Sequence, residues 1–322
     1  MIKSLSKIFE PLLFLFLVFI AVFLCISGNL SKAVTEGISL WASCVVPSIF
    51  PYLFLTAILS QLYSTKKVAK LISPITTKVF NISGNAGFSF LLSILSGYPI
   101  GAKTVSELRL SNLLNDEESV RAACLCSTSS PMFLIGSVGG IMFNDKFFGA
   151  ILFLTHILAT LLNGFIFSFY KRTSTVASLN KTTNSKSFNL LYDSAYSSVI
   201  SILIIGSLIT VFYLLTEILV KIGILSPFIN ALTLLTKNEN LSSGIIFGIF
   251  ECTKGMKALS ILPKKIALPF CAFLSSFGGL SVIAQSVAYL KKAKIKTAPF
   301  LLSKVTAAVI SLILGFIFSF LL

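Results

Sequence analysis

The stretch LLSILSGYPIGAKTVSELR, residues 91–109, is apolar at its start and interrupted in its middle. The interruption is SGYPIG, residues 96–101, and charged residues follow it, beginning with Lys103. Glycine and proline leave backbone groups that lipid cannot satisfy, and the part after the break is too polar to complete a membrane crossing. The sequence therefore predicts a re-entrant hairpin over 84–112, with its tip enclosed by protein or water.

Three further apolar segments are interrupted in a similar way. Residues 116–143 break at STSSP, residues 241–260 break near ECTKG, and residues 264–292 break at SSFGGLS. The second of these segments resembles 91–109 in turning polar after its break. We therefore expect 241–260 to form a second hairpin and the other two segments to form discontinuous helices.

The composition places all four segments in a membrane. Of 322 residues, 55% are hydrophobic and 11% are charged, with a mean hydropathy of +0.94. Long apolar runs satisfy their own backbone groups as helices, so the expected fold class is an all-α membrane protein. The net charge is +15, but the basic residues lie in the loops between the apolar runs. This pattern sets the orientation of membrane helices and does not form a nucleic-acid-binding patch. Six cysteines and one histidine lack the spacing of a metal site.

The order of the segments divides the chain into two similar halves. An additional N-terminal transmembrane helix over 1–34 precedes a first repeat over 35–170. A polar cytoplasmic loop over 171–190 then leads to a second repeat over 191–322. Each repeat contains a span, an interfacial stretch, a hairpin, a broken helix and a closing span. The first apolar run could also be a signal peptide, but no small-residue cleavage site follows it, which favours a retained helix.

The distribution of lysine and arginine predicts the orientation. These residues gather in alternate loops, which places the N-terminus in the cytoplasm. Because of the additional helix, the first repeat starts outside and the second starts inside, so the repeats are antiparallel. We expect about seven crossings, two re-entrant hairpins and two discontinuous helices. This arrangement is typical of inverted-repeat transporters, which work by alternating access around a site at mid-membrane.

The four breaks supply the candidate binding residues. Half-helix ends carry partial charges that attract ions, and small hydroxyl and amide side chains hydrogen-bond polar ligands. Small residues also let membrane helices pack closely, so close packing is the alternative for any single cluster. The residues expected to bind the solute are Gly97, Tyr98, Pro99, Gly101, Lys103, Ser127, Thr128, Ser129, Ser130, Glu251, Thr253, Lys254, Ser275, Ser276, Gly278, Gly279, Ser281 and Gln285.

Glu251 is the candidate for proton coupling, because a carboxylate inside a membrane hairpin has to pair or titrate. The alternative is a hairpin tip that reaches the headgroups, with Lys254 as a solvated partner, and Lys103 has the same two readings. His156 lies in the plain span 147–170, where a single histidine is more often satisfied by a neighbouring helix, so it is not a principal candidate. No cofactor is expected, and a coupling proton or sodium ion stays open.

Motifs for several kinds of chemistry do not occur in the sequence. It contains no nucleotide-binding P-loop, no HExxH and no GxSxG pattern, and no pair of carboxylates lies within one of its apolar runs. An ATP-driven pump or an intramembrane hydrolase would need one of these. We therefore do not expect an enzyme.

Four stretches together carry a resemblance to a known family. They are LLSILSGYPIGAKTVSELR (91–109), CSTSSPMFLIGSVGGIMF (126–143), GIFECTKGMKAL (248–259) and FLSSFGGLSVIAQS (273–286). In these the chain resembles the YlbJ-like sporulation integral membrane proteins, part of the wider group with a nucleoside recognition or Gate domain. The paired hairpins and broken helices are also similar to those of the concentrative nucleoside transporters, in which the solute lies between hairpin tips and unwound helices.

The resemblance implies a function in endospore formation. The SpoVV branch of the family is associated with moving dipicolinate across the outer forespore membrane, which implies the same small organic anion and a bacterial inner membrane here. Positive half-helix ends, Lys103 and Lys254 are compatible with a dianion. One alternative is a transporter of a nucleoside or another neutral metabolite, and a second is a structural protein of spore membrane assembly. The lipid bilayer is the other expected partner, and the oligomeric state stays open.

Overall fold

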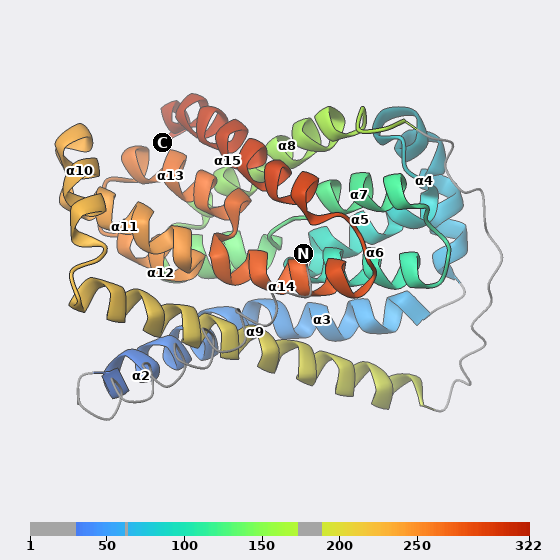
Figure 1. Ribbon diagram of the computed structural model, residues 1–322, viewed down its shortest axis with the longest axis horizontal. Helices are drawn as coiled ribbons and strands as arrows, with labels where there is room; N and C mark the ends of the chain where they lie inside the picture. The colour runs from blue at the N-terminus through green and yellow to red at the C-terminus, as the bar shows by residue number, and fades with distance from the viewer. Residues whose placement is uncertain (1–29, 62–63, 173–188) are drawn as a thin grey trace, which may run out of the picture.

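The computed structural model describes residues 30–61, 64–172 and 189–322, and these residues form helices and connecting turns without any strand (Figure 1). The expected all-α class is therefore confirmed for this part of the chain. Residues 1–29, which make up most of the predicted additional helix, lie outside the described residues. So do residues 173–188, most of the predicted polar loop.

Each half of the chain has the same order of elements. The first half contains α2 (Leu30–Leu40), the π-helical η1 (Trp41–Val45), α3 (Val46–Gln61), α4 (Ser64–Phe80), α5 (Gly84–Ser96), α6 (Ile100–Leu110), α7 (Asp116–Leu125), the π-helical η2 (Met132–Met142) and α8 (Lys146–Phe167). The second half contains α9 (Leu190–Lys221), α10 (Ser226–Thr236), α11 (Glu239–Phe250), α12 (Cys252–Leu259), α13 (Lys264–Phe277), α14 (Gly279–Lys292), α15 (Thr297–Phe318) and the final turn η3 (Ser319–Leu321). A long span, a separate helix, a close helix pair, an interrupted helix and a second long span follow one another twice.

Five helical segments are long and apolar enough to cross a membrane: Ser31–Ser60, Lys146–Phe167, Leu190–Lys221, Lys264–Lys292 and Thr297–Leu321. They coincide with five of the roughly seven predicted crossings. One of the other two falls mostly within residues 1–29. The other, predicted over 116–143, corresponds to α7 and η2, which are 10 and 11 residues long and are not among the five spans. In addition, α4 and α5 form a pair bent by 94°, which is either a sixth, broken span or a re-entrant turn.

The long helices lie on two sides of the molecule, with most of the short helices between them (Figure 1). On one side, α2 and α3 pack against α9, and on the other, α13 and α15 pack against α8. Polar contacts help to join the two halves: Thr306 of α15 donates a hydrogen bond to Asn163 of α8 at 2.6 Å. The helices of the two hairpins, α5, α6, α11 and α12, therefore lie between two layers of long helices.

Two clusters of buried apolar side chains hold the halves together. The first includes Val45, Ile205 and Leu274, and the second includes Val120 and Phe300. Each cluster takes residues from before and after the connecting loop, so neither half has a separate core. Burial of such side chains contributes about 1.5–3 kcal/mol each.

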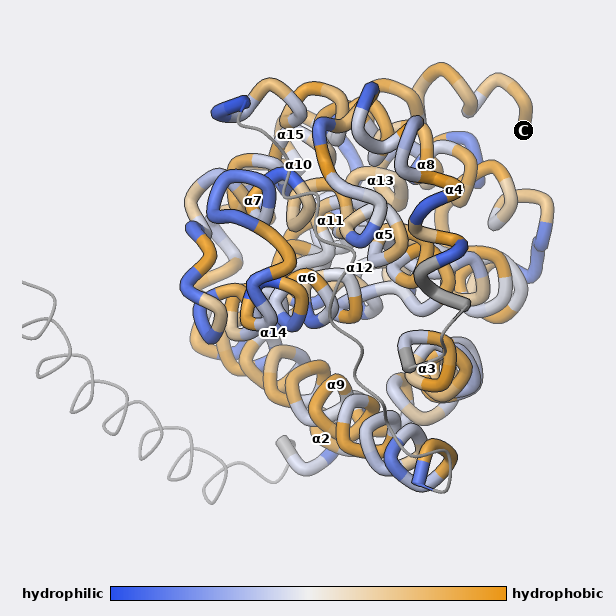
Figure 2. Tube along the Cα trace, turned by 90° about the vertical axis from the view of Figure 1, so that its right-hand side faces the viewer, coloured by the Kyte–Doolittle hydropathy of each residue, from blue (hydrophilic) through white to orange (hydrophobic). Residues whose placement is uncertain are grey.

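Apolar side chains also cover the outside of the long helices. Exposed examples are Leu162 on α8, Leu203 on α9 and Leu302 on α15. Figure 2 shows hydrophobic residues along most of α9 and hydrophilic segments beside α7 and α14. A surface of this kind is unfavourable in water, whereas in a membrane it contacts lipid tails. The long helices are therefore embedded in a bilayer.

Candidate solute-binding site

The first hairpin consists of α5 and α6 and turns at Gly97, Tyr98 and Pro99, with a cis peptide bond before the proline. Gly97 has a φ of 75°, which residues with a side chain rarely adopt. The hairpin tip lies directly on the break that follows α7, because a Cβ atom on Gly101 would be 1.6 Å from the carbonyl oxygen of Cys126. Glycine at these positions therefore allows the tip to contact the backbone of the first broken helix.

The second hairpin consists of α11 and α12 and turns at Glu251. The Glu251 carboxylate accepts a hydrogen bond from the backbone N–H of Lys254 at 2.7 Å and so caps α12. Gly279, at the start of α14, has a φ of 74°, and a Cβ atom there would be 2.9 Å from the carbonyl oxygen of Gly248 and 3.0 Å from the nitrogen of Cys252. The second hairpin thus contacts the second broken helix, as the first hairpin contacts the first.

The two broken helices meet at Tyr98. Its hydroxyl lies 3.1 Å from the carbonyl oxygen of Ser127 and 3.2 Å from that of Ser275, so it can donate to one of them at a time. Ser129 Oγ donates to the same Ser275 carbonyl at 3.3 Å. These contacts bring together the STSSP break of the first half and the SSFGGLS break of the second.

His156 of α8 joins the same two breaks. Its Nε2 accepts a hydrogen bond from the backbone N–H of Ser129 at 2.8 Å, and its Nδ1 lies 2.8 Å from Ser276 Oγ. Since Nε2 is an acceptor, a neutral ring carries its proton on Nδ1 and donates it to Ser276. His156 is not among the expected site residues, yet both of its partners belong to the breaks.

Lys304 of α15 is a charged residue at this meeting point, and it is only 2% exposed. Its Nζ donates to the Tyr98 hydroxyl at 2.8 Å and to Ser127 Oγ at 3.2 Å, and it lies 4.2 Å from the centre of the Tyr98 ring. Within the described part of the chain, no carboxylate lies within 4.0 Å of it. Lys304 is also missing from the expected residues, because 297–320 reads as a plain apolar span. The available signal is a lysine about two turns inside such a helix, which generally marks a functional position.

A cavity of about 50 Å³ lies beside this meeting point. Ile49 of α3 and Ile205 of α9 cover one side of it. A water molecule takes about 30 Å³ of liquid, so the cavity has room for water but not for an organic solute in this conformation. Among the expected residues, those that line it are Gly97, Tyr98, Ser129, Ser130, Glu251, Thr253, Gly278 and Gln285.

The other ten expected residues lie outside this cavity. Thr128 bonds to Ser93 of α5 at 2.8 Å, and Lys103 faces a separate pocket. The expected residues that do not line the cavity are Pro99, Gly101, Lys103, Ser127, Thr128, Lys254, Ser275, Ser276, Gly279 and Ser281. Most of them position the tips and breaks through the contacts described above.

Two polar groups of α14 stand out because they are buried without a partner. Gln285 Nε2 and Ser281 Oγ make no hydrogen bond to any described residue. A buried amide or hydroxyl of this kind costs about 1–3 kcal/mol unless something satisfies it. Since Gln285 lines the cavity, water or a solute at this place would supply its missing partner.

Lys254 lies at the second hairpin in an enclosed setting. Its Nζ forms an ion pair with Glu217 Oε1 of α9 at 2.6 Å and lies 4.1 Å from the centre of the Tyr213 ring. The Tyr213 hydroxyl in turn donates to Glu36 Oε2 of α2 at 2.8 Å. Lys254 therefore connects α12 to α9 and, through Tyr213, to α2, and it is 6% exposed, so it is not a solvated headgroup partner.

The described residues contain no group of three or more histidine, cysteine, aspartate or glutamate side chains that could hold a metal ion. Their five cysteines are buried free thiols. The oxygen atoms around the cavity, from Glu251, Ser129 and Thr253, are of the kind that binds a proton or a hard cation.

Comparison with known proteins finds a family match and a relative. Residues 42–146, from η1 to the start of α8, match the Gate family, described as nucleoside recognition. Over 336 aligned residues the chain is 29% identical to the Sporulation integral membrane protein YlbJ of Bacillus subtilis strain 168, covering 95% of this chain and 82% of the relative. The chain is a homologue of that protein. The resemblance seen in the four sequence stretches is thus confirmed, and no solved structure matches the chain.

Proposed function

We propose that this protein transports a small organic anion across a bacterial inner membrane by alternating access, with dipicolinate during sporulation as the first solute to test. Two findings support a carrier of this general kind. The homologue is an integral membrane protein named for sporulation, and the matched domain is named for recognition of a small molecule. The homology also agrees with a location in a membrane of the developing spore, such as the outer forespore membrane.

The observation that carries the proposal is Lys304. The Lys304 ammonium group is buried away from solvent, and its partners are two hydroxyl groups and an aromatic ring rather than a carboxylate. Such a group is costly in a low-dielectric interior unless an opposite charge approaches. A solute carboxylate at the breaks would supply that charge. An anion therefore suits the meeting point of the four breaks better than a cation.

The arrangement of the helices supports alternating access. The elements occur twice in the same order, α3 and α8 pack against their counterparts α9 and α15, and each hairpin contacts its own broken helix. The predicted antiparallel repeats would place equivalent hairpins on opposite sides of the site. In such carriers the two repeats rock around a fixed mid-membrane site. The small cavity seen here then belongs to a state in which the site is closed around its own side chains.

The test is uptake of labelled dipicolinate into proteoliposomes that contain the purified protein. We expect saturable uptake that falls at least tenfold in Lys304→Met, a loss of about 1.4 kcal/mol or more of transition-state stabilisation, and that Lys304→Arg partly restores. The Ser129→Ala, Ser276→Ala double variant should also transport poorly, because both hydroxyls lie between the two breaks. Normal uptake in Lys304→Met would contradict the anion site.

A neutral solute is the second candidate, and Gln285 is the observation that favours it. Its unpartnered amide lines the cavity, and amides recognise neutral hydrogen-bonding groups such as those of a nucleoside. Uridine serves as the comparison solute in the same vesicles. Uridine uptake that survives Lys304→Met and is lost in Gln285→Ala would replace the anion by a neutral metabolite. Absence of uptake for both solutes would favour a structural function.

A further inference from the structure

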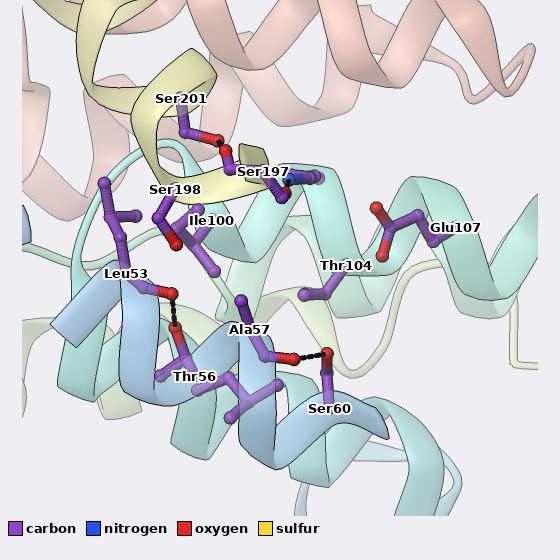
Figure 3. Close-up of a pocket in the computed structure, with 12 residues that line it drawn as sticks. Leu53, Thr56, Ala57, Ser60, Ile100, Thr104, Glu107, Ser197, Ser198 and Ser201 are labelled. Atoms are coloured by element: carbon purple, nitrogen blue, oxygen red, sulfur yellow. Dashed lines mark hydrogen bonds between the residues drawn. The ribbon is translucent and has the colours of Figure 1, made fainter. Parts of the chain in front are cut away.

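A second pocket, larger than the central cavity, lies between α3, α5, α6 and α9 (Figure 3). Its volume is about 250 Å³, close to the lower end of the roughly 300–1,000 Å³ range of ligand sites. Ser60 and Glu107 line it and are exposed, so the pocket reaches the surface of the protein. A small solute that does not fit the central cavity can therefore fit here.

The pocket wall presents a cation and several hydroxyl groups. Lys103 Nζ donates to Ser197 Oγ at 2.9 Å, which leaves two of its three N–H groups for another partner. No carboxylate of the described residues lies within 4.0 Å of this nitrogen. The Ser201 hydroxyl donates to the Ser197 carbonyl oxygen at 2.7 Å, and Thr56 Oγ1 lies 2.7 Å from both the Tyr52 carbonyl oxygen and Ser96 Oγ. These hydroxyls are therefore already paired, and the attraction for an anion comes from Lys103.

The pocket continues toward the central cavity along two helices. On α3, Ile49 lines the cavity and Leu53, one turn further on, lines the pocket. On α9, Ile205 lines the cavity and Ser201, again one turn away, lines the pocket. Ile100, at the start of α6, lines the pocket directly beside the first hairpin tip. The linings of the two spaces therefore lie one helical turn apart on both helices.

We propose that this pocket is an access site that binds a small organic anion against Lys103 before the anion reaches Lys304. This inference rests on the proposed function, since it assigns a first position to the same solute. Lys103 lies nearer than Glu107 to the hairpin tip along α6, so a negative group would meet the lysine on the way inward. Ser60 lies in the last turn of α3, just before Lys-rich α4, which places the opening on the side predicted to be cytoplasmic.

The first experiment measures charge selection at the pocket without any transport. A Ser60→Cys variant is made in a Cys25→Ser background, since the other five cysteines are buried. The purified protein reacts with methanethiosulfonate reagents of opposite charge. We expect the anionic reagent to react faster than the cationic one. In Lys103→Met the ratio of the two rates should fall about tenfold. Excess dipicolinate should slow the reaction of the cysteine in the parent protein. Glu107→Gln should increase the preference, because it removes the negative charge at the opening.

Lys70→Met is the matched control, because Lys70 is exposed on α4 and does not line the pocket. It should leave the reagent preference unchanged. An equal effect of Lys70→Met and Lys103→Met would overturn the access site, since it would show only the general positive charge of the protein. A preference that Lys103→Met does not change would overturn it as well, whatever the uptake assay gives.

The second experiment separates the access site from the central site. We expect Lys103→Met to raise the KM for dipicolinate uptake about tenfold while kcat stays within about twofold, because binding is weakened before the transport step. Lys103→Arg should restore most of the affinity. If the protein shows no uptake but Ser60→Cys still prefers the anionic reagent and is protected by dipicolinate, the access site would stand and the proposed transport would be rejected. An unchanged KM in a transporting Lys103→Met variant would reject the access site alone.

Discussion

Each hairpin carries a lysine within about one turn of its tip, and the two lysines have different surroundings. Lys103 of the first hairpin bonds to Ser197 of α9 and faces a pocket of about 250 Å³. Lys254 of the second hairpin forms an ion pair with Glu217, which is also on α9. The rings of Tyr213 and Phe247 cover it, with their centres 4.1 and 4.9 Å from its Nζ. One lysine is open to a solute, and the other is enclosed.

The two lysines mark two sides of the molecule that differ in accessibility. Ser197 and Glu217 lie near opposite ends of α9, about 30 Å apart at 1.5 Å per residue, which is close to the thickness of a bilayer core. The Tyr213–Glu36 hydrogen bond extends the enclosed side to α2. Under the proposed alternating access, this conformation has an accessible pocket beside α6 and is closed beside α12. The contacts of Lys254, Glu217, Tyr213 and Glu36, which we call the seal, should then break when the other side opens.

The largest effect is expected from Gly101→Ala, which tests whether the first hairpin tip is fixed on the broken helix. The new Cβ would be 1.6 Å from the Cys126 carbonyl oxygen, a backbone atom that has little room to move. We expect a loss of about 3 kcal/mol or more in the free energy of unfolding, seen as little monodisperse protein in detergent. Gly136→Ala is the control, because its Cβ would meet only the flexible end of Met132 at 3.5 Å. A stable Gly101→Ala variant would place the tip elsewhere and remove the basis of the comparison.

The next largest effect is expected from Glu217→Gln, which tests the seal. It leaves Lys254 buried without its carboxylate, and the closed side should lose about 1–3 kcal/mol, less than for a fully buried pair because Glu217 is 38% exposed. Cys252 lines the central cavity and is buried, so it reports opening from within. In a Cys25→Ser background its labelling by a maleimide should accelerate about tenfold, since 1.4 kcal/mol is a factor of ten.

Asp193→Asn is the control for that measurement, as it removes an exposed carboxylate from the other end of α9. Its labelling rate should match that of the parent chain. Unchanged labelling in Glu217→Gln would show that the ion pair does not hold this side closed. The difference between the two hairpin lysines would then be one of packing only.

Much of this comparison could be predicted from the sequence, because breaks in apolar helices are local features. Glycine, proline and serine clusters interrupt a hydrophobic run wherever it packs, so SGYPIG, STSSP, ECTKG and SSFGGLS could be found without coordinates. The two hairpin lysines could be found too, because each follows a break directly. Long apolar runs are local features as well, and five of the predicted crossings correspond to spans of the structure.

The partners across helices could not be predicted in this way. Lys304 falls inside the predicted span 297–320, but its burial against Tyr98 and Ser127 depends on helices from the other half of the chain. His156 forms its hydrogen bonds with residues 27 and 120 positions away. The pairing of Lys254 with Glu217, rather than with water, likewise depends on how α12 packs on α9. Hydropathy gives the segments, whereas tertiary packing decides which polar groups meet.

A smaller effect is expected from Tyr213→Phe, which separates the two parts of the seal. The variant keeps an aromatic ring over Lys254 but loses the hydrogen bond to Glu36. A hydrogen bond of this kind contributes about 0.5–1.5 kcal/mol, so Cys252 labelling should accelerate only about threefold. Tyr213→Ala also removes the cation–π contact and should accelerate it further. Equal rates for the two variants would mean that the ring does not contribute to closure.

The smallest effect is expected at a second ion pair on the side predicted to be outside, between Asp145 and Lys264, which join α8 to α13. The hydrogen bond from Lys264, followed by those from the first backbone N–H groups of α8, lowers the pKa of Asp145 below its usual value. A lowered folded-state pKa means that the contribution of the pair is complete above the unfolded value of about 3.9 and is lost only at lower pH. Lys264 is 45% exposed, so Asp145→Asn should cost less than about 1 kcal/mol. We therefore expect Cys252 labelling to be nearly unchanged by Asp145→Asn at pH 7. A change as large as that of Glu217→Gln would show that exposed pairs also hold this side closed, and that burial of Lys254 is not what distinguishes the two hairpins.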